Sequence, residues 1–179
     1  MTVPAEFERT VLPHLNAAHN LARWLVREPA LAEDVVQDAM VRALSYFGTY
    51  RGGDARAWLL RIVRNTAYTT MTIRRRTAMT SLDAAASETE ASAPFQVPDP
   101  ADDPEAALAH RQRAGTLEQA LAALPLELRE CLVLRELEEL SYKQIATITD
   151  VAIGTVMSRL WRARRALMQG RDRAEEGMA

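Results

Sequence analysis

Residues Ser141–Leu167 read SYKQIATITDVAIGTVMSRLWRARRAL, and this stretch predicts a short helix, a tight turn and a second, arginine-rich helix. Ser141 is a favoured N-cap residue, and Gln144 follows it at the spacing of a capping box. Asp150 is expected in the turn, because its short polar side chain tolerates a positive φ. A capped helix, a turn and a basic helix in this order favour a helix-turn-helix.

The second predicted helix has one apolar face and one face that suits DNA. Steps of about 100° per residue place four apolar residues on one stripe: Val156, Leu160, Ala163 and Leu167. The opposite face carries Thr155, Ser158, Trp161, Arg162 and Arg165. Hydroxyls and guanidinium groups bind phosphates and base edges, and residues 151–173 hold six arginines, including Arg159, against one acid. The alternative is a solvated basic helix end that is favoured by the helix dipole.

Length and composition limit the possible classes of protein. The 179 residues suffice for one ordinary domain or two small ones, and the net charge of -2 means that any DNA binding must come from local clusters. The single cysteine, Cys131, excludes an internal disulfide and a cysteine zinc cluster. No apolar run approaches the roughly 20 residues of a membrane span, and the first residues lack signal-peptide character. We therefore expect a cytoplasmic protein without membrane insertion.

The chain is expected to be all-α, because apolar residues recur at helical spacing and no alternating strand pattern is present. The segment Phe7–Val26 predicts the first helical stretch. Another helix is expected from Pro29, a residue suited to a first helical turn. Its outward side carries Asp34, Gln37 and Asp38. This face is either solvated or a docking surface for another protein.

Neither histidines nor acids form a convincing metal or catalytic site. Glu33 joins Asp34 and Asp38 in an acidic group, but no histidine or further acid is placed to complete it. His14 and His19 are five residues apart and do not share a helix face. We therefore predict no catalytic residue, no metal ligand and no cofactor.

A loop and a long helix follow. The paired glycines of Tyr50–Asp54 break the helical pattern, and a helix is expected from Ala55 into the arginine triplet Arg74–Arg76. An exposed strip is predicted along this helix, formed by Arg61, Arg64, Asn65, Tyr68 and Thr72. Basic residues among aromatics and amides suit single-stranded DNA, whose bases stack on rings while arginines pair with phosphates. An ordinary surface helix is the alternative.

Composition changes after Met79 and divides the chain. Residues 81–105 hold seven acids and four prolines but no Lys or Arg, which predicts a flexible acidic linker. We expect two small helical domains, 1–78 and 105–170, joined by a linker at 79–104 and followed by a tail at 171–179. The linker is either a solubilising spacer or a mimic of nucleic acid. Two helices before Leu137 are expected to support the helix-turn-helix.

Three stretches, taken together, resemble the extracytoplasmic-function (ECF, group 4) sigma factors of bacterial RNA polymerase. The first is AEDVVQDAMVRAL at Ala32–Leu44, similar to region 2.2 of that family. The second is Tyr50–Asp54 leading into WLLRIVRN at Trp58–Asn65, similar to regions 2.3 and 2.4. The third, similar to region 4, comprises Leu124–Leu137, Leu140–Ala146 and Gly154–Leu160. The resemblance extends from about Phe7 to Leu167.

The resemblance implies a non-enzymatic initiation factor. Its implied partners are core RNA polymerase, through the beta-prime clamp helices and the beta flap, promoter DNA and an anti-sigma factor. Asp34, Gln37 and Asp38 are the implied polymerase contacts. The implied −10 contacts are Tyr50, Arg51, Asp54, Trp58, Arg61, Arg64, Asn65 and Tyr68. The implied −35 contacts are Thr155, Ser158, Arg159, Trp161, Arg162 and Arg165.

Two departures from the family pattern affect the expected sequence preference. Met157 stands where the family often has Lys or Arg, and Val151-Ala152 replaces a common turn sequence. Two other classes also remain open. A free-standing helix-turn-helix regulator would use the same basic helix without polymerase and typically as a dimer. A helical adaptor or an enzyme would use the carboxylates of Glu33, Asp34 and Asp38.

Overall fold

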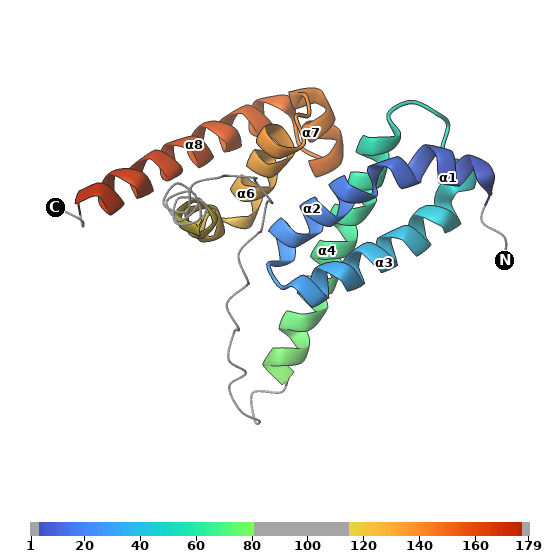
Figure 1. The fold of residues 1–179 in the computed structure, drawn as a ribbon, viewed down its shortest axis with the longest axis horizontal. Coiled ribbons are helices and arrows are strands. Elements are labelled where there is room, and N and C mark those ends of the chain that lie inside the picture. The colour runs from blue at the N-terminus through green and yellow to red at the C-terminus, as the bar shows by residue number, and fades with distance from the viewer. Residues whose placement is uncertain (1–3, 81–114, 177–179) are drawn as a thin grey trace, which may run out of the picture.

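The computed structural model describes residues 4–80 and 115–176, and the regular elements in these ranges are all helical (Figure 1). The N-terminal domain contains α1 (Ala5–Val11), α2 (Leu15–Val26), α3 (Pro29–Tyr46) and α4 (Ala55–Thr80), with 3-10 turns at Leu12–His14 and Phe47–Thr49. The C-terminal domain contains helical residues 115–123, α6 (Leu126–Leu132), a π-helical turn at Val133–Leu137, α7 (Tyr142–Thr149) and α8 (Ile153–Glu176). The predicted all-α class is confirmed, and the predicted linker lies outside the described residues from position 81 onward.

The N-terminal domain is a helical bundle in which α2, α3 and α4 pack on one another. Its core contains fully buried Leu21, Val35, Leu59 and Val63. As predicted, Pro29 occupies the first turn of α3. The first helical stretch is interrupted at the 3-10 turn Leu12–His14, because Pro13 has no N–H for an α-helical hydrogen bond.

The loop between α3 and α4 depends on its two glycines. Gly52 and Gly53 have φ angles of 84° and 97°, which residues with a Cβ rarely adopt. Asp54 then caps α4, because its Oδ1 atom accepts a hydrogen bond of 2.9 Å from the backbone N–H of Ala57. The loop therefore has a defined shape at the point where α4 begins.

The C-terminal domain contains the predicted helix-turn-helix. The Ser141 hydroxyl accepts from the N–H of Gln144 at 3.2 Å, and the Gln144 side chain accepts from the N–H of Ser141 at 2.8 Å, which completes the capping box. Asp150 adopts the left-handed conformation, with φ 57° and ψ 45°. Val156 and Leu160 on α8 are buried, so both the turn and the inward face of α8 are as predicted.

The two domains pack against each other through α7 on α4 and α6 on α2 (Figure 1). Arg129 on α6 is 6% exposed, and it donates to the carbonyl of Ala122 at 2.9 Å and to that of Leu25 in α2 at 3.4 Å. Burial lowers the pKa of Arg129, with the charge of Arg27 adding to the effect. Within residues 4–80 and within residues 115–176, no helix is long and apolar enough to span a bilayer.

Candidate nucleic-acid interface

The outward face of α8 has the composition expected for a duplex-reading surface. Exposed side chains on this face are Thr155, Ser158, Trp161, Arg162 and Arg165. Trp161 is 59% exposed, and the guanidinium of Arg165 lies 5.2 Å from its ring centroid, a cation–π contact that orients both groups. Met157, 53% exposed, adds an apolar group beside these polar ones. Contact between this face and DNA stays a prediction.

Arg159 differs from the other arginines of this set. It is half-buried, and its Nη1 atom has no hydrogen-bond partner. The pKa of the Cys131 thiol is raised by burial and by the charge of Glu130, while Arg159 acts in the opposite direction. Arg159 therefore faces α6 with part of its guanidinium, and a role in DNA contact stays a prediction.

An aromatic cluster holds the loop between α3 and α4. The ring of Tyr50 stacks on Phe47 at 5.8 Å between centroids and lies 5.2 Å from the ring of Trp58. The Tyr50 hydroxyl donates to the carbonyl of Gly53 at 2.8 Å. Arg51 is exposed at the loop surface. The predicted −10 residues Tyr50 and Trp58 are thus brought together at the start of α4.

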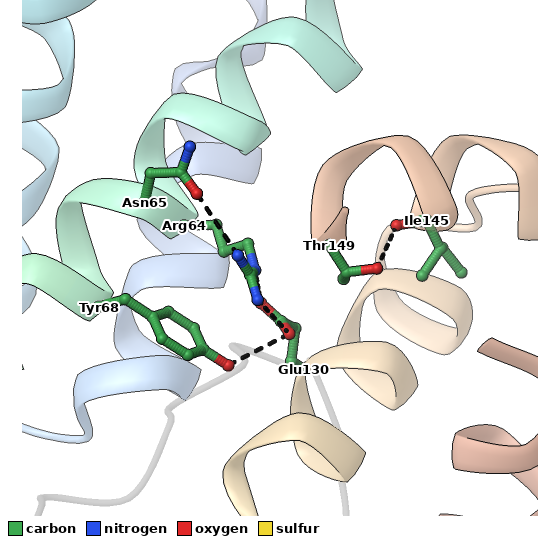
Figure 2. A network of polar contacts seen from close by, with 6 residues as sticks. All are labelled: Arg64, Asn65, Tyr68, Glu130, Ile145 and Thr149. Atoms are coloured by element: carbon green, nitrogen blue, oxygen red, sulfur yellow. Dashed lines mark hydrogen bonds and ion pairs between the residues drawn. The ribbon is translucent and has the colours of Figure 1, made fainter. Parts of the chain in front are cut away.

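The strip predicted on α4 is only partly open to solvent. Arg61 and Asn65 are exposed, but the side chain of Arg64 is only 16% exposed. Figure 2 shows Arg64 and Tyr68 directed at Glu130 of α6, with Arg64 Nε donating at 2.5 Å and the Tyr68 hydroxyl at 3.2 Å. The expectation that Arg64 and Tyr68 face solvent is wrong, because the C-terminal domain covers them.

Burial and mutual charge shift the pKa values of the three residues that meet at Glu130. Its carboxylate is fully buried, and this burial raises its pKa even though the hydrogen bond and charge of Arg64 act in the opposite direction. Burial by itself lowers the pKa of Arg64, but the hydrogen bond and charge of Glu130 raise it overall. Burial and the charge of Glu130 also raise the pKa of Tyr68, which keeps the phenol protonated as a donor.

Sequence reasoning did not identify Glu130 as a site residue. The available signal was a charged pair, Arg129 and Glu130, inside the otherwise apolar run LRECLVL. Charged residues are almost never fully buried unless they are paired. Such a pair therefore indicates partners elsewhere in the fold, but it does not say which residues they are.

Other polar contacts also join the domains. Glu138, which is 4% exposed, accepts from the Asn20 side chain at 2.6 Å and from Arg56. The side chain of Gln144 donates to Asp54, the residue that caps α4. Arg61 lies 3.7 Å from Asp150 at the surface. Three of the predicted −10 residues besides Tyr68, namely Asp54, Arg61 and Arg64, are thus in contact with the C-terminal domain.

The predicted docking face on α3 is open. Asp34, Gln37 and Asp38 are all exposed along one side of the helix. Val41, which is 65% exposed and one turn further along, extends this polar face with an apolar group that the sequence analysis did not include. Within the described parts of the chain, no three His, Cys, Asp or Glu side chains gather as metal ligands.

Comparison with known proteins assigns both domains to known families. The family model "Sigma-70 region 2" matches residues 10–77, and "Sigma-70, region 4" matches residues 114–167. The RNA polymerase sigma-H factor of Pseudomonas aeruginosa is 35% identical over 162 residues, covering 90% of this chain and 83% of the relative. The ECF RNA polymerase sigma-E factor of Escherichia coli K12 is 36% identical over 137 residues, covering 75% and 70%.

Solved structures agree with this assignment. The sigma factor RpoE in complex with the anti-sigma factor NepR from Bartonella quintana matches with a TM-score of 0.75 and 27% identity, over 93% of this chain and 97% of that one. The fold of CnrH, solved with the cytosolic domain of CnrY, matches with a TM-score of 0.62 and 24% identity, over 93% and 87%. Two sigma-70 domains in the expected order, with relatives similar over most of their length, lead to one conclusion: the chain belongs to the extracytoplasmic-function sigma factors of bacterial RNA polymerase.

Proposed function

We propose that this chain binds core RNA polymerase and directs it to a set of promoters, while the chemistry of transcription remains that of the polymerase. The observation that carries the proposal is the presence, in one chain, of a region 2 domain and a region 4 helix-turn-helix domain. A free-standing helix-turn-helix regulator accounts for α7 and α8 but leaves the region 2 domain without a role.

Polymerase binding, −10 binding and −35 binding are each assigned to a different surface of the chain. The exposed face of Asp34, Gln37 and Asp38, extended by Val41, contacts the polymerase. The aromatic loop and the predicted strip on α4 hold the −10 element as melted single strand, because rings and arginines suit unpaired bases and phosphates. The outward face of α8 enters the major groove at the −35 element, where the exposed Arg162 donates to the edge of a guanine, the commonest base partner of arginine.

A further partner is a protein that controls availability of these surfaces. The structure most similar in fold among those described above is a sigma factor in complex with an anti-sigma factor. We expect a regulator of the same class for this chain.

Run-off transcription with core polymerase, in the presence and absence of this chain, tests the proposal. We expect a promoter-dependent transcript only when the chain is added. Binding of the chain to duplex DNA without core polymerase, combined with no transcript at any candidate promoter, would favour the free-standing regulator.

The polymerase face is tested by Asp38→Arg, which places a positive charge among exposed acids. We expect this variant to lose core polymerase in a pull-down while its affinity for −35 duplex is retained. Arg9→Asp, also a charge reversal at an exposed helical position, is the matched control. Unchanged core binding by Asp38→Arg would remove this face from the docking site.

A further inference from the structure

Three large apolar side chains are exposed at one-turn intervals along the first half of α8. Ile153 is 46% exposed, Met157 53% and Trp161 59%. Residues four apart lie on the same side of a helix, so these three form one row, which we call the apolar stripe. A single exposed apolar residue is ordinary on a protein surface, but a continuous row of large ones indicates contact with another molecule.

The apolar stripe borders the polar face that carries the predicted −35 contacts. Met157 directly precedes Ser158, and Trp161 directly precedes Arg162; both of these polar residues are exposed. The guanidinium of Arg165 lies 5.2 Å from the centroid of the Trp161 ring, so a positive charge stands beside the stripe. Duplex DNA fits this combination, because its phosphates pair with arginines while its base edges reach the apolar side chains.

The major groove offers one apolar group to such a stripe. Its base edges present hydrogen-bond donors and acceptors, and the exception is the C5 methyl group of thymine. In a helix-turn-helix, the N-terminal residues of the second helix contact these edges. Met157 lies in the second turn of α8, which begins at Ile153. Its unbranched thioether has no donor for a guanine, but it adapts its shape to an apolar partner.

We propose that Met157 is a specificity-determining residue of the −35 contact, and that its thioether packs on the C5 methyl group of a thymine. The chain then prefers a −35 element with thymine at the base pair that Met157 faces. This inference rests on the proposed function, since it places α8 in the major groove of that element. It deepens that function by naming the base and the chemical group that one residue selects. Trp161, one turn further along, extends the same apolar contact.

The same helix offers a matched control for Met157. Met168 is also an exposed methionine, 61% exposed, but it lies about 16 Å further along α8, beyond the turns that contact base edges. Arg164, on the same side of the helix as the stripe, is held by an ion pair of 2.7 Å with Glu136, within the C-terminal domain. Because Met157 is exposed, its replacement is expected to leave the fold intact.

The first measurement compares the base preference of the full-length wild type with that of its Met157→Arg and Met168→Ala variants. Each protein enriches duplexes from a library that is randomised over one segment of the length of a −35 element. The wild type is expected to select thymine at a position where Met157→Arg selects guanine, the commonest base partner of arginine. Met168→Ala should select the same sequence as the wild type.

The second measurement removes the methyl group itself. Each thymine of the enriched duplex is replaced in turn by deoxyuridine, which lacks the C5 methyl group and keeps the same base-pairing edge. At the position that faces Met157, the wild type and Met168→Ala are expected to lose affinity about fourfold, the effect of withdrawing one methyl group from an apolar contact. Met157→Ala should show no loss there. Fluorescence anisotropy measures the affinities.

Three results would overturn the inference. One is an equal loss from deoxyuridine in the wild type and in Met157→Ala, since the methyl group would then have another partner. The second is an enriched sequence without thymine, or no enriched sequence, since α8 is open to solvent in the free chain. The third is an unchanged preference in Met157→Arg, which would leave the apolar stripe to a protein partner. None of these measurements uses polymerase, so failure of run-off transcription counts against the proposed function and not against this contact.

Discussion

At the scale of single residues, several side chains serve both the local fold and the contact between domains. Asp54 caps α4 with one carboxylate oxygen and accepts from Gln144 with the other. Partial burial tends to raise its pKa, but the hydrogen bonds from Ala57 and Gln144 lower it overall. The residue that starts α4 is therefore also one of the residues that position the C-terminal domain.

Substitution of Asp54 should separate these two roles. Asp54→Ala removes both hydrogen bonds and is expected to lower the free energy of unfolding by about 1 kcal/mol or more, the usual cost of losing an N-cap. Asp54→Asn keeps a cap acceptor for Ala57 and should lose less. Urea unfolding measures both values, and equal losses in the two variants would show that the cap contributes little.

Glu130 should give the chain an unusual dependence on pH. Its pKa in the folded chain is raised above the usual 4.5 by burial, against the opposing effect of Arg64, Tyr68 and Arg159. A raised folded pKa means that this group's contribution to stability is complete below the usual value and is lost as pH rises through the folded pKa. Glu130→Gln cannot titrate at this position.

The free energy of unfolding of both proteins, measured by urea from below pH 4.5 to neutral pH, tests this dependence. The wild type is expected to lose stability relative to Glu130→Gln as pH rises, because ionisation of the buried carboxyl is penalised. The other carboxylates titrate in both proteins and cancel in the difference. A difference that is constant across this range would contradict the assignment to Glu130.

At the scale of elements, α8 combines a packing face with a recognition face in adjacent residues. Leu160 is 1% exposed in the core of the C-terminal domain, whereas Trp161 is 59% exposed on the outer side. The helical period places neighbouring residues about 100° apart, so substitutions one position apart should act on different properties.

Leu160→Ala and Trp161→Ala are expected to have separate effects. Leu160→Ala should lower the free energy of unfolding by about 2 to 5 kcal/mol, because it leaves a cavity in the core. Trp161→Ala should change stability by no more than about 0.5 kcal/mol but weaken binding to a −35 duplex. Denaturation and duplex affinity are measured on both variants. Strong destabilisation by Trp161→Ala would place its ring in the core.

The elements differ in how far the sequence predicts them. The helix-turn-helix was predictable because its capping box, its left-handed residue and its apolar stripe are local patterns within Ser141–Leu167. The interruption of the first helical stretch at Pro13 was also a local signal, but helical periodicity on both sides outweighed it. The covering of Arg64 and Tyr68 was not predictable, because it depends on Glu130, 66 and 62 residues away along the chain.

At the scale of the whole molecule, polar contacts join the N-terminal and C-terminal domains. Arg129, Glu130 and Glu138 are buried charged residues on the C-terminal side of this contact. Separation of the domains would leave these charged groups without their partners, which is costly in free energy. The two domains should therefore unfold together when these contacts are intact.

Calorimetry of the full-length chain tests this coupling. We expect the wild type to unfold in one transition, with equal calorimetric and van't Hoff enthalpies. Glu138→Ala removes the acceptor of Asn20 and Arg56 and should weaken the contact by about 1 to 3 kcal/mol, since the side chain of Arg56 is 33% exposed and regains water. Its van't Hoff enthalpy should then fall below the calorimetric value as the domains unfold separately. Glu136→Ala, which leaves all contacts between the domains intact, should retain a single transition. Two resolved transitions in the wild type would mean that these contacts do not couple the domains.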